Sequence, residues 1–402
     1  MKSVLVVALA AIGIAAFVLD VALMHAMTNL LHMNDFGKFY YSTRAFLDGT
    51  GMYASNPATN LRFVEAPELQ FLNMNPPHFH LLVLPFAALQ PERAVTLWLG
   101  TSLFALIVAL LVISRELNVS WTPVRLLAVT AGTLAFAGTQ SFFATGNLSL
   151  LLLLAMTMCW ASARRGRWTA AAVWLGACLS VKPFLLIFAP YLAATRRFRA
   201  LGILLATAGA SVAVGLVVFG AGEYRAWYAA LTQSGDWAWG VMNASLLGVF
   251  RRAFDTQPIG TPLLVAPSLV NGWIVAAALV GIVTLVRTIG DREPHAIDRA
   301  FALLLVAAQL ISPLGWIYYL WLPAGPVAAV MASSAVKRRA ALHIALVLIA
   351  SIGFAYPMPF LLAFRNHAWA TLTIASIYFW ATLALWLLLI DDRRRSSAHL
   401  VN

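Results

Sequence analysis

Long apolar runs follow one another along almost the whole chain, and short polar or basic segments separate them. A run of about 20 apolar residues can cross a bilayer as an α-helix, and shorter runs can enter it in pairs. The pattern therefore predicts an all-α, polytopic membrane protein with about 11–13 membrane segments. We expect these segments at residues 3–23, 79–90, 94–114, 126–142, 148–162, 168–181, 184–195, 200–219, 263–286, 300–312, 316–335, 340–356 and 368–390.

The polar segments between these runs predict the loops. We expect outward-facing loops at residues 24–77, 220–262 and 357–367. The last residues, 391–402, are expected to form a cytoplasmic tail. The apolar piece 79–90 contains Pro85, and a complete crossing there would reverse the side of later loops, so we interpret it as short or re-entrant. No polar segment is long enough for a separate soluble domain. Residues 1–402 are therefore expected to form one membrane domain.

Composition supports a membrane location and explains the net charge. The chain is 61% hydrophobic and 10% charged, against about 25% charged in an average soluble protein. Much of the net charge of +12 lies in clusters at the ends of apolar runs. These clusters are Arg164, Arg165 and Arg167; Arg196, Arg197 and Arg199; Lys337, Arg338 and Arg339; and Arg393, Arg394 and Arg395. Cytoplasmic loops retain such residues, so the clusters indicate orientation in the cell inner membrane rather than binding to nucleic acid.

The first outward loop contains a segment with helical periodicity. Phe36, Phe39, Tyr40, Thr43 and Leu47 follow the spacing of one helix face, and a glycine at position 49 is a plausible stop. The pattern predicts an amphipathic helix lying on the membrane surface. The aspartate before it, Asp35, has two interpretations. It can cap the helix N-terminus, or it can act as a general base beside a lipid-borne substrate, and the two are compatible.

Lys182 is the only lysine or arginine in the apolar stretch 168–195. A charge at membrane depth is costly and indicates function by default. Lysine commonly binds phosphate, which makes Lys182 a candidate phosphate ligand. The alternative is a lysine whose long side chain reaches the outer headgroups.

Several arginines also fall in the expected outward loops. Arg251, Arg252 and Arg365 oppose the usual retention of positive charge inside, so we expect an anionic headgroup or phosphate as their partner. The aromatic residues of 220–262 are typical of an interfacial belt, although one or two could stack on a sugar. No spacing of histidine or cysteine predicts a metal site or disulfide, and no phosphate-binding loop is present, so we expect no cofactor.

An ordered set of short motifs resembles glycosyltransferase family 87, the polyprenol-phosphate-mannose-dependent mannosyltransferases of the GT-C superfamily. The motifs are Asp35-Phe36, Tyr40-Tyr41, Arg44, Gly49 and Tyr53; Pro76-Pro77; Gly146 with Leu148; Lys182-Pro183; Asn243 with Ser245; and Ser312-Pro313 with Trp316. The sequence departs from the family pattern at Asn147, where glutamine is usual, and at Tyr318, where histidine is usual. These departures leave the acceptor and the sugar open.

The resemblance implies a GT-C-like fold and an inverting glycosyl transfer at the outer face of the membrane. The implied partners are a polyprenyl-phosphate sugar donor, a glycan or glycolipid acceptor and the lipid bilayer. Asp35 would be the catalytic base. The donor phosphate would be bound by Lys182, Arg251 and Arg252. The substrate-binding residues would be Tyr40, Arg44, Asn147, Asn243, Tyr318 and Arg365.

Three other functions fit parts of the pattern. A flippase or transporter of lipid-linked sugars would also have outward cations and broken helices, but it would not need a carboxylate beside the surface helix. A non-catalytic protein of envelope assembly would need neither Asp35 nor Lys182. A ligase or polymerase of lipid-linked oligosaccharides would use similar chemistry on a larger acceptor.

Overall fold

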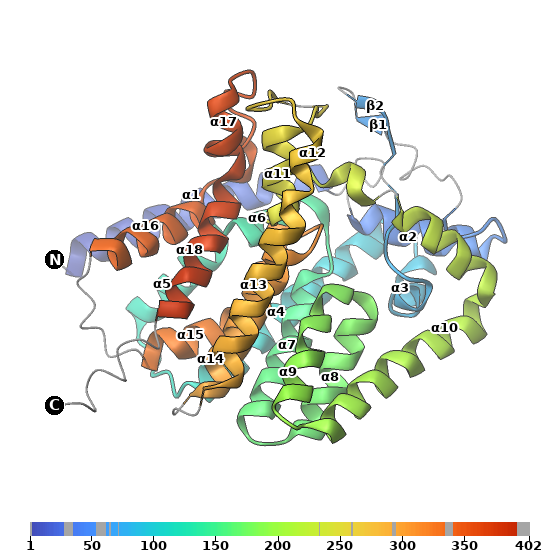
Figure 1. The fold of residues 1–402 in the computed structure, drawn as a ribbon, viewed down its shortest axis with the longest axis horizontal. Helices are drawn as coiled ribbons and strands as arrows, with labels where there is room; N and C mark the ends of the chain where they lie inside the picture. The colour runs from blue at the N-terminus through green and yellow to red at the C-terminus, as the bar shows by residue number, and fades with distance from the viewer. Residues whose placement is uncertain are drawn as a thin grey trace.

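The computed structural model describes residues 2–27, 35–53, 62–63, 66–70, 72–232, 234–258, 260–291, 295–333 and 341–391. These residues are predominantly helical, as the apolar pattern predicts (Figure 1). The first nine helices are α1 (Lys2–Met27), α2 (Asp35–Leu47), α3 (His80–Ala87), α4 (Pro91–Glu116), α5 (Pro123–Ala135), α6 (Ala137–Thr145), α7 (Ser149–Arg164), α8 (Trp168–Val181) and α9 (Phe188–Ala194). The others are α10 (Phe198–Leu231), α11 (Leu246–Phe254), α12 (Pro267–Val270), α13 (Gly272–Ile289), α14 (Ala296–Ile311), α15 (Ala324–Ser333), α16 (Ala341–Ala355), α17 (Ala368–Leu372) and α18 (Ile377–Asp391).

Shorter elements join these helices. The 3₁₀ helices are η1 (Pro77–Phe79), η2 (Pro183–Ile187), η3 (Ser234–Trp237), η4 (Ile317–Trp321), η5 (Met358–Phe360) and η6 (Ile374–Ser376). The strands β1 (Arg62–Phe63) and β2 (Ala66–Gln70) pair antiparallel within the first expected loop. The fold class is all-α, as predicted, and this small hairpin between α2 and η1 is too short to show a period of two in the sequence.

The membrane segments fall into two length classes. Five described helices are long and apolar enough to cross a bilayer, namely Ser3–His25, Pro91–Glu116, Phe198–Leu231, Pro267–Ile289 and Ala368–Ile390. Helices α5 and α6 add a sixth span if the pair, bent by 55°, is counted as one. Other expected segments are shorter apolar helices, including Pro77–Ala87, which matches the predicted short piece at 79–90. The chain is thus polytopic, but length alone supports five or six complete crossings among the described residues.

Helix α10 extends beyond the span predicted at 200–219. It continues to Leu231, and Gly220 adopts φ 80° and ψ 162°, which breaks the helical path. Only glycine adopts that conformation easily, so the helix changes direction there. The first residues of the expected loop 220–262 are consequently helical.

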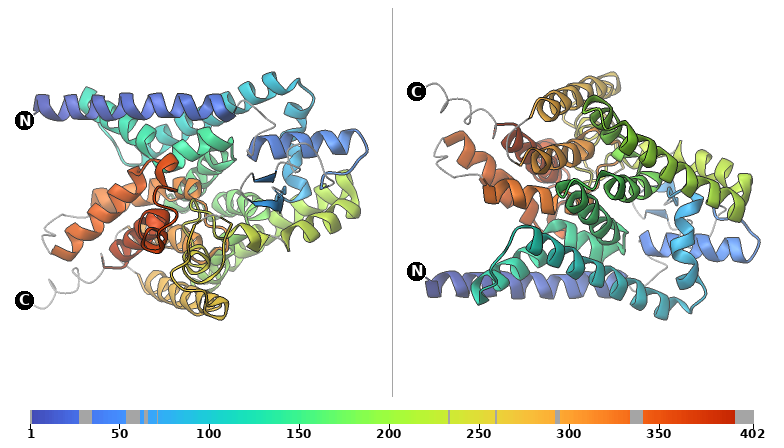
Figure 2. Two further views of the ribbon diagram at one scale, coloured as in Figure 1. Left: turned by 90° about the horizontal axis from the view of Figure 1, so that it is seen from above. Right: turned by 90° about the horizontal axis from the view of Figure 1, so that it is seen from below.

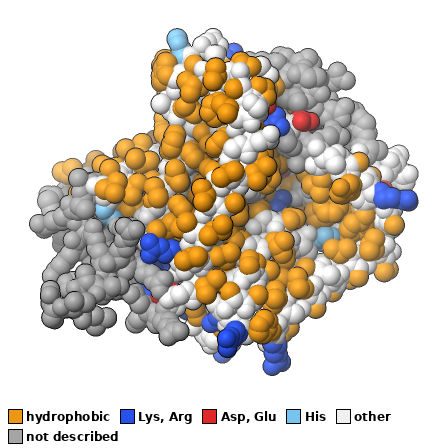
Figure 3. Space-filling view, viewed as in Figure 1, with side chains coloured by type: hydrophobic (Ala, Val, Ile, Leu, Met, Phe, Trp, Pro, Cys, Tyr) orange, Lys and Arg blue, Asp and Glu red, His pale blue; other side chains and the backbone are white. Residues whose placement is uncertain are grey.

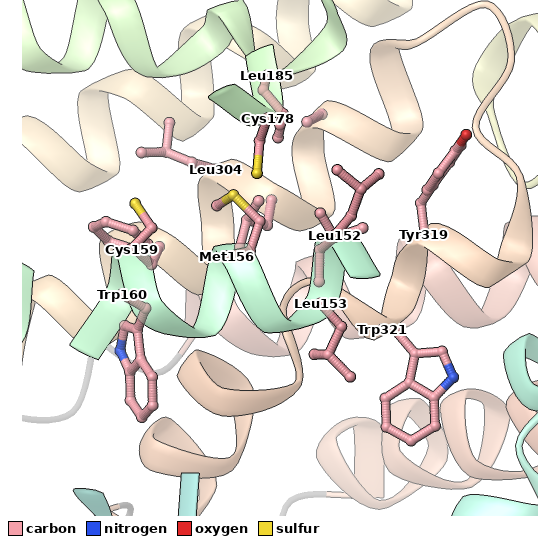
Figure 4. Packing of buried hydrophobic residues seen from close by; sticks show 14 of the residues in the cluster. Leu152, Leu153, Met156, Cys159, Trp160, Cys178, Leu185, Leu304, Tyr319 and Trp321 are labelled. Carbon is pink, nitrogen blue, oxygen red and sulfur yellow. The ribbon is translucent and has the colours of Figure 1, made fainter. Parts of the chain in front are cut away.

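The centre of the molecule is helix α7, which packs against α4, α8 and α14. Its buried residues Met156, Cys159 and Trp160 lie among Cys178 and Leu304 from the neighbouring helices (Figure 4). Both cysteines are free and buried, and they serve there as small packing residues. Figure 2 shows α1 along one edge of the molecule, where it packs on α5 and α6.

The outer surface seen in Figure 3 is mostly hydrophobic, and Lys and Arg side chains lie mainly near its margins. Many side chains on α1, α10, α13 and α16 are exposed and apolar. Such an all-round apolar surface needs lipid rather than water as its solvent.

A group of charges built on two buried carboxylates, here called the ion-pair cluster, lies where α4 and α7 end and α14 begins. It comprises Glu116, Arg164, Arg165, His295 and Asp298. Asp298 is 1% exposed, accepts a hydrogen bond from Trp160 Nε1 at 2.9 Å and forms an ion pair with Arg164 Nε at 3.1 Å. Arg164 and Arg165 both contact Glu116. The basic cluster at this helix end is therefore partly neutralised by carboxylates from other helices.

Candidate active site

Helix α2 places Asp35 at the edge of the bundle. The predicted helix is confirmed, and Gly49 follows it with φ +75°, the left-handed conformation that ends helices. Phe36 stacks on Trp98 of α4 with centroids 5.0 Å apart, and Phe39 packs edge-on against Phe79 at 4.9 Å. The helix is more deeply packed than a surface helix would be. Lys38, which lies off the predicted apolar stripe, is 7% exposed.

A cavity of about 710 Å³ lies between α2, the segment before η1, the break between α8 and α9, and the turn after α14. Its polar lining comes from Asp35, Lys38, Asn75, Thr145, Lys182, Ser312, Tyr318 and Tyr319. Most of the remaining wall is apolar or aromatic. Elements that are distant in the sequence thus place a carboxylate, two lysines and hydroxyl groups around one space.

Asp35 has two polar partners in this cavity. Lys38 Nζ lies 2.8 Å from Oδ1, one helical turn along α2, and the Tyr318 hydroxyl donates to Oδ2 at 3.3 Å. Both partners orient the carboxylate, because each presents a hydrogen-bond donor to one of its oxygens. A carboxylate oriented in this way can accept a proton from a hydroxyl group that enters the cavity.

Lys182 enters the cavity from the break between α8 and η2. Pro183 disfavours helical geometry in the residue before it, and Lys182 accordingly has φ −129° and ψ 89°. Its ammonium donates to Asn75 Oδ1 at 2.8 Å and lies 5.3 Å from the centre of the Tyr319 ring. Burial lowers the pKa of this ammonium to about 8, and the Asp35 carboxylate opposes that shift. Within the described residues, Lys182 forms no ion pair with a carboxylate.

Two residues predicted to bind substrate, Tyr40 and Arg44, lie on another side of α2. The Tyr40 hydroxyl donates to the Leu89 carbonyl at 2.8 Å. Arg44 reaches the Ala87 carbonyl at 3.4 Å and Asp48 at 3.6 Å. Neither residue lines the cavity, so their contacts tie α2 to the end of α3.

Asn147 and Asn243 are buried and hold turns beside the cavity. Asn147 Oδ1 accepts from the Ser149 backbone at the start of α7. Asn243 Oδ1 accepts from the Gly315 backbone at 2.9 Å, and its Nδ2 donates to the Pro313 carbonyl at 2.9 Å. Neither side chain lines the cavity, so both shape its walls indirectly.

The predicted phosphate-binding arginines do not join Lys182. Arg251 pairs with Asp255 at 2.7 Å, one turn further along α11. Arg252 is 1% exposed and donates to the Gly240 and Asn243 carbonyls and to Ser376 Oγ. With Arg365 it lines a separate hollow of about 10 Å³. The expected grouping of three phosphate ligands therefore needs correction, because Arg252 is used to hold backbone turns together.

Other cavity residues did not appear among the predicted site residues. They are Lys38, Asn75, Trp237, Trp316 and Tyr319. Lys38 is one helical turn from Asp35, and this spacing in a helix indicates an ion pair between the two side chains. Asn75 is 107 residues from its partner Lys182, so no local pattern could indicate that contact. In the parts of the chain that the structure describes, no three metal-binding side chains cluster.

A comparison with protein-family models finds one match, glycosyltransferase family 87, over residues 73–313. The match covers more than half of the chain and confirms the resemblance seen in the sequence. It includes Lys182 and the Ser312-Pro313 turn, whereas Asp35 precedes it and Tyr318 follows it. Neither the curated proteins nor the solved structures contain a significant match to this chain.

Proposed function

The chain belongs to glycosyltransferase family 87 and is a membrane glycosyltransferase; from that premise we infer that it uses a polyprenyl-phosphate sugar as donor. The transferred sugar is a hexose, with mannose the first candidate, and the acceptor is a hydroxyl of a glycan or glycolipid. The reaction takes place at the outer face of the cytoplasmic membrane and inverts the anomeric centre. The observation that carries the proposal is that Asp35 and Lys182 line the same cavity.

Asp35 is the proposed general base. Its carboxylate takes the proton of the acceptor hydroxyl while the acceptor oxygen forms a bond to the anomeric carbon of the sugar. The bond between that carbon and the phosphate oxygen breaks on the opposite face, and the electron pair leaves with the polyprenyl phosphate. Lys38 and Tyr318 hold the carboxylate in place for this step.

Lys182 is the proposed ligand of the donor phosphate. The leaving phosphate gains negative charge during the reaction, and a cation already in position stabilises that charge without rearrangement. Lys182 meets this requirement because a neutral amide oxygen, rather than a carboxylate, holds its ammonium.

The apolar wall of the cavity suits a polyprenyl chain. Phe184, Leu186, Ile187 and Pro190 continue from Lys182 along η2 and α9. Leu186 is 54% exposed although it lines the cavity, so this wall reaches the outside of the molecule. A lipid tail could therefore lie along η2 while its phosphate approaches Lys182.

The test uses purified protein in nanodiscs with radiolabelled polyprenyl-phosphate-mannose and a membrane-extract acceptor pool. Label transfer by the wild type that is lost in Asp35→Asn, with an unchanged melting profile, would support the assignment. Equal transfer by both would remove Asp35 as the base. Absence of transfer by the wild type, together with flipping of the labelled lipid, would favour the transporter. Parallel donors carrying glucose, galactose or a pentose determine the sugar.

A further inference from the structure

We propose that His80, which does not line the cavity, is a positioning residue that fixes the Lys182 ammonium through a buried chain of hydrogen bonds. This inference rests on the proposed role of Lys182 in binding the donor phosphate. The His80 side chain has no exposed surface, and its ring lies between Thr43 of α2 and Asn73 in the segment before η1. An imidazole with a partner on each nitrogen is held in one orientation.

The donor-to-acceptor direction of the hydrogen-bond chain follows from Lys182, because an ammonium can only donate hydrogen bonds. Its Nζ donates to Asn75 Oδ1 at 2.8 Å, so Asn75 Nδ2 donates to Asn73 Oδ1 at 3.2 Å. Asn73 Nδ2 is then the atom 2.8 Å from His80 Nε2. Since an amide nitrogen donates, His80 Nε2 accepts and carries no proton.

The other end of the hydrogen-bond chain is compatible with the same direction. Thr43 Oγ1 donates its single proton to the Phe39 carbonyl at 2.7 Å. It can therefore only accept from His80 Nδ1, which is also 2.7 Å away. His80 is thus a neutral imidazole with its proton on Nδ1. Every donor in the hydrogen-bond chain points toward α2, in the order Lys182, Asn75, Asn73, His80 and Thr43. Hydrogen bonds aligned in this way polarise one another.

This arrangement keeps Lys182 from forming an ion pair with Asp35. A lysine side chain is flexible, and an ion pair between Lys182 and Asp35 would occupy both the proposed base and the proposed phosphate ligand. The Asn75 oxygen fixes Lys182 while leaving its charge uncompensated. The chain ends at the Phe39 carbonyl, one turn after Asp35 in the same helix. The base and the cation are therefore positioned by one element, α2.

Three variants test the chain in nanodiscs, with binding of radiolabelled polyprenyl phosphate and initial rates of sugar transfer as readouts. His80→Phe keeps a ring but removes both nitrogens, whereas His80→Gln keeps one donor and one acceptor. Tyr378→Phe is the matched control, because it removes a buried hydroxyl that donates to the Tyr356 carbonyl at 2.9 Å and does not line the cavity.

His80→Phe removes the partner of Asn73 Nδ2, so Asn73, Asn75 and the Lys182 ammonium are no longer held in place. We expect polyprenyl phosphate binding to weaken about tenfold, the scale of one hydrogen bond to a charged group, and the donor KM to rise equally. We expect kcat at saturating donor to change less than about threefold, since Asp35 keeps its own partners. His80→Gln should recover most of the affinity, and Tyr378→Phe should bind as the wild type does. Wild-type affinity and donor KM in folded His80→Phe would overturn the proposal.

The proton position on His80 gives a second readout, which is measured in the wild-type protein and uses His80→Gln only to assign the signals. In protein labelled with ¹⁵N-histidine, the His80 signals are those lost in His80→Gln. We expect a protonated Nδ1 and an unprotonated Nε2 in the wild type. A proton on Nε2 instead would overturn the direction of the chain.

The outcomes separate this proposal from the proposed function. If wild-type protein binds polyprenyl phosphate in a His80-dependent way but transfers no sugar, the positioning role stands and the transferase mechanism fails. If transfer is normal and insensitive to His80→Phe, the positioning role alone fails. If the wild type does not bind polyprenyl phosphate, both fail.

Discussion

Helices α7 and α14 run between two sites that both contain carboxylates and basic residues. The two sites differ in how their cations are bound. Near one end, Leu148 just before α7 and Ile311 at the end of α14 line the cavity with Asp35 and Lys182. At the other end, about 24 Å along the 16 residues of α7, lies the ion-pair cluster. There Arg164 meets two carboxylates from other helices, whereas Lys182 is held by a neutral amide.

The difference separates charges that stabilise the bundle from charges that remain available to a ligand. A buried carboxylate paired with arginine is compensated, and its removal leaves an unpaired charge in a poor solvent. An ammonium bound only to neutral oxygen is incompletely compensated and attracts an anion. The comparison therefore predicts that variants in the cavity change turnover, whereas variants in the ion-pair cluster change stability.

The largest expected effect on turnover is that of Asp35→Asn. The amide cannot accept the acceptor proton, so the rate of sugar transfer should fall by about 10²–10⁴-fold, the usual contribution of a general base. Initial rates in nanodiscs measure the loss. Glu92→Gln is a control, since this exposed acid near the start of α4 does not line the cavity. Comparable losses in both variants would contradict the assignment.

The next largest effect is expected for Lys182→Met, which keeps the side-chain length but removes the charge. We expect kcat/KM for the donor to fall about 10²-fold, because an oriented group that stabilises developing negative charge contributes on that scale. Arg251→Gln is the matched control, because Arg251 is cationic but pairs with Asp255 away from the cavity. A larger loss of kcat/KM in Arg251→Gln than in Lys182→Met would indicate that Arg251 binds the donor phosphate.

Asp298→Asn should leave turnover nearly unchanged and lower stability instead. The amide leaves Arg164 without its closest carboxylate partner, and breaking a buried ion pair costs up to about 3–5 kcal/mol. A lower melting temperature in a thermal scan, with a wild-type rate well below that temperature, is the expected result. A reduced rate in folded protein would show that the two ends of α7 are coupled.

The smallest effect is expected from pH. Lys182, with its pKa lowered to about 8, is charged below that pH and loses its proton above it. Donor binding would favour the charged form, so kcat/KM for the donor should fall above about pH 8 while kcat changes less. Lys182→Arg should move this fall to higher pH, because arginine stays protonated. If the pH dependence of kcat/KM is the same in Lys182→Arg as in the wild type, deprotonation of Lys182 does not cause the fall.

The sequence predicted those structural elements that depend on interactions between residues close together in the chain. The spacing from Phe36 to Leu47 predicted α2, and Lys182-Pro183 predicted a broken helix at the cavity. The short piece at 79–90 followed from its prolines and the sidedness of the loops. In each case the determining interactions lie within a few residues of one another.

Contacts between distant segments could not be predicted in the same way. Arg252 looked like an outward cation, but carbonyls of Trp239, Gly240 and Asn243 surround it. Lys38 lies outside the apolar stripe of α2, yet it is buried and lines the cavity. Both cases show that a sequence pattern identifies a helix face but does not identify what packs against it.

The exposed position of Leu186 has a consequence for how the enzyme would meet its donor. A cavity that opens along a lipid-facing wall exchanges its ligand by lateral diffusion within the bilayer. The relevant concentration is then the mole fraction of donor among the surrounding lipids, and dilution of the vesicles in buffer would not alter the rate. Two membranes with equal total donor but different lipid content would support different rates of glycan synthesis.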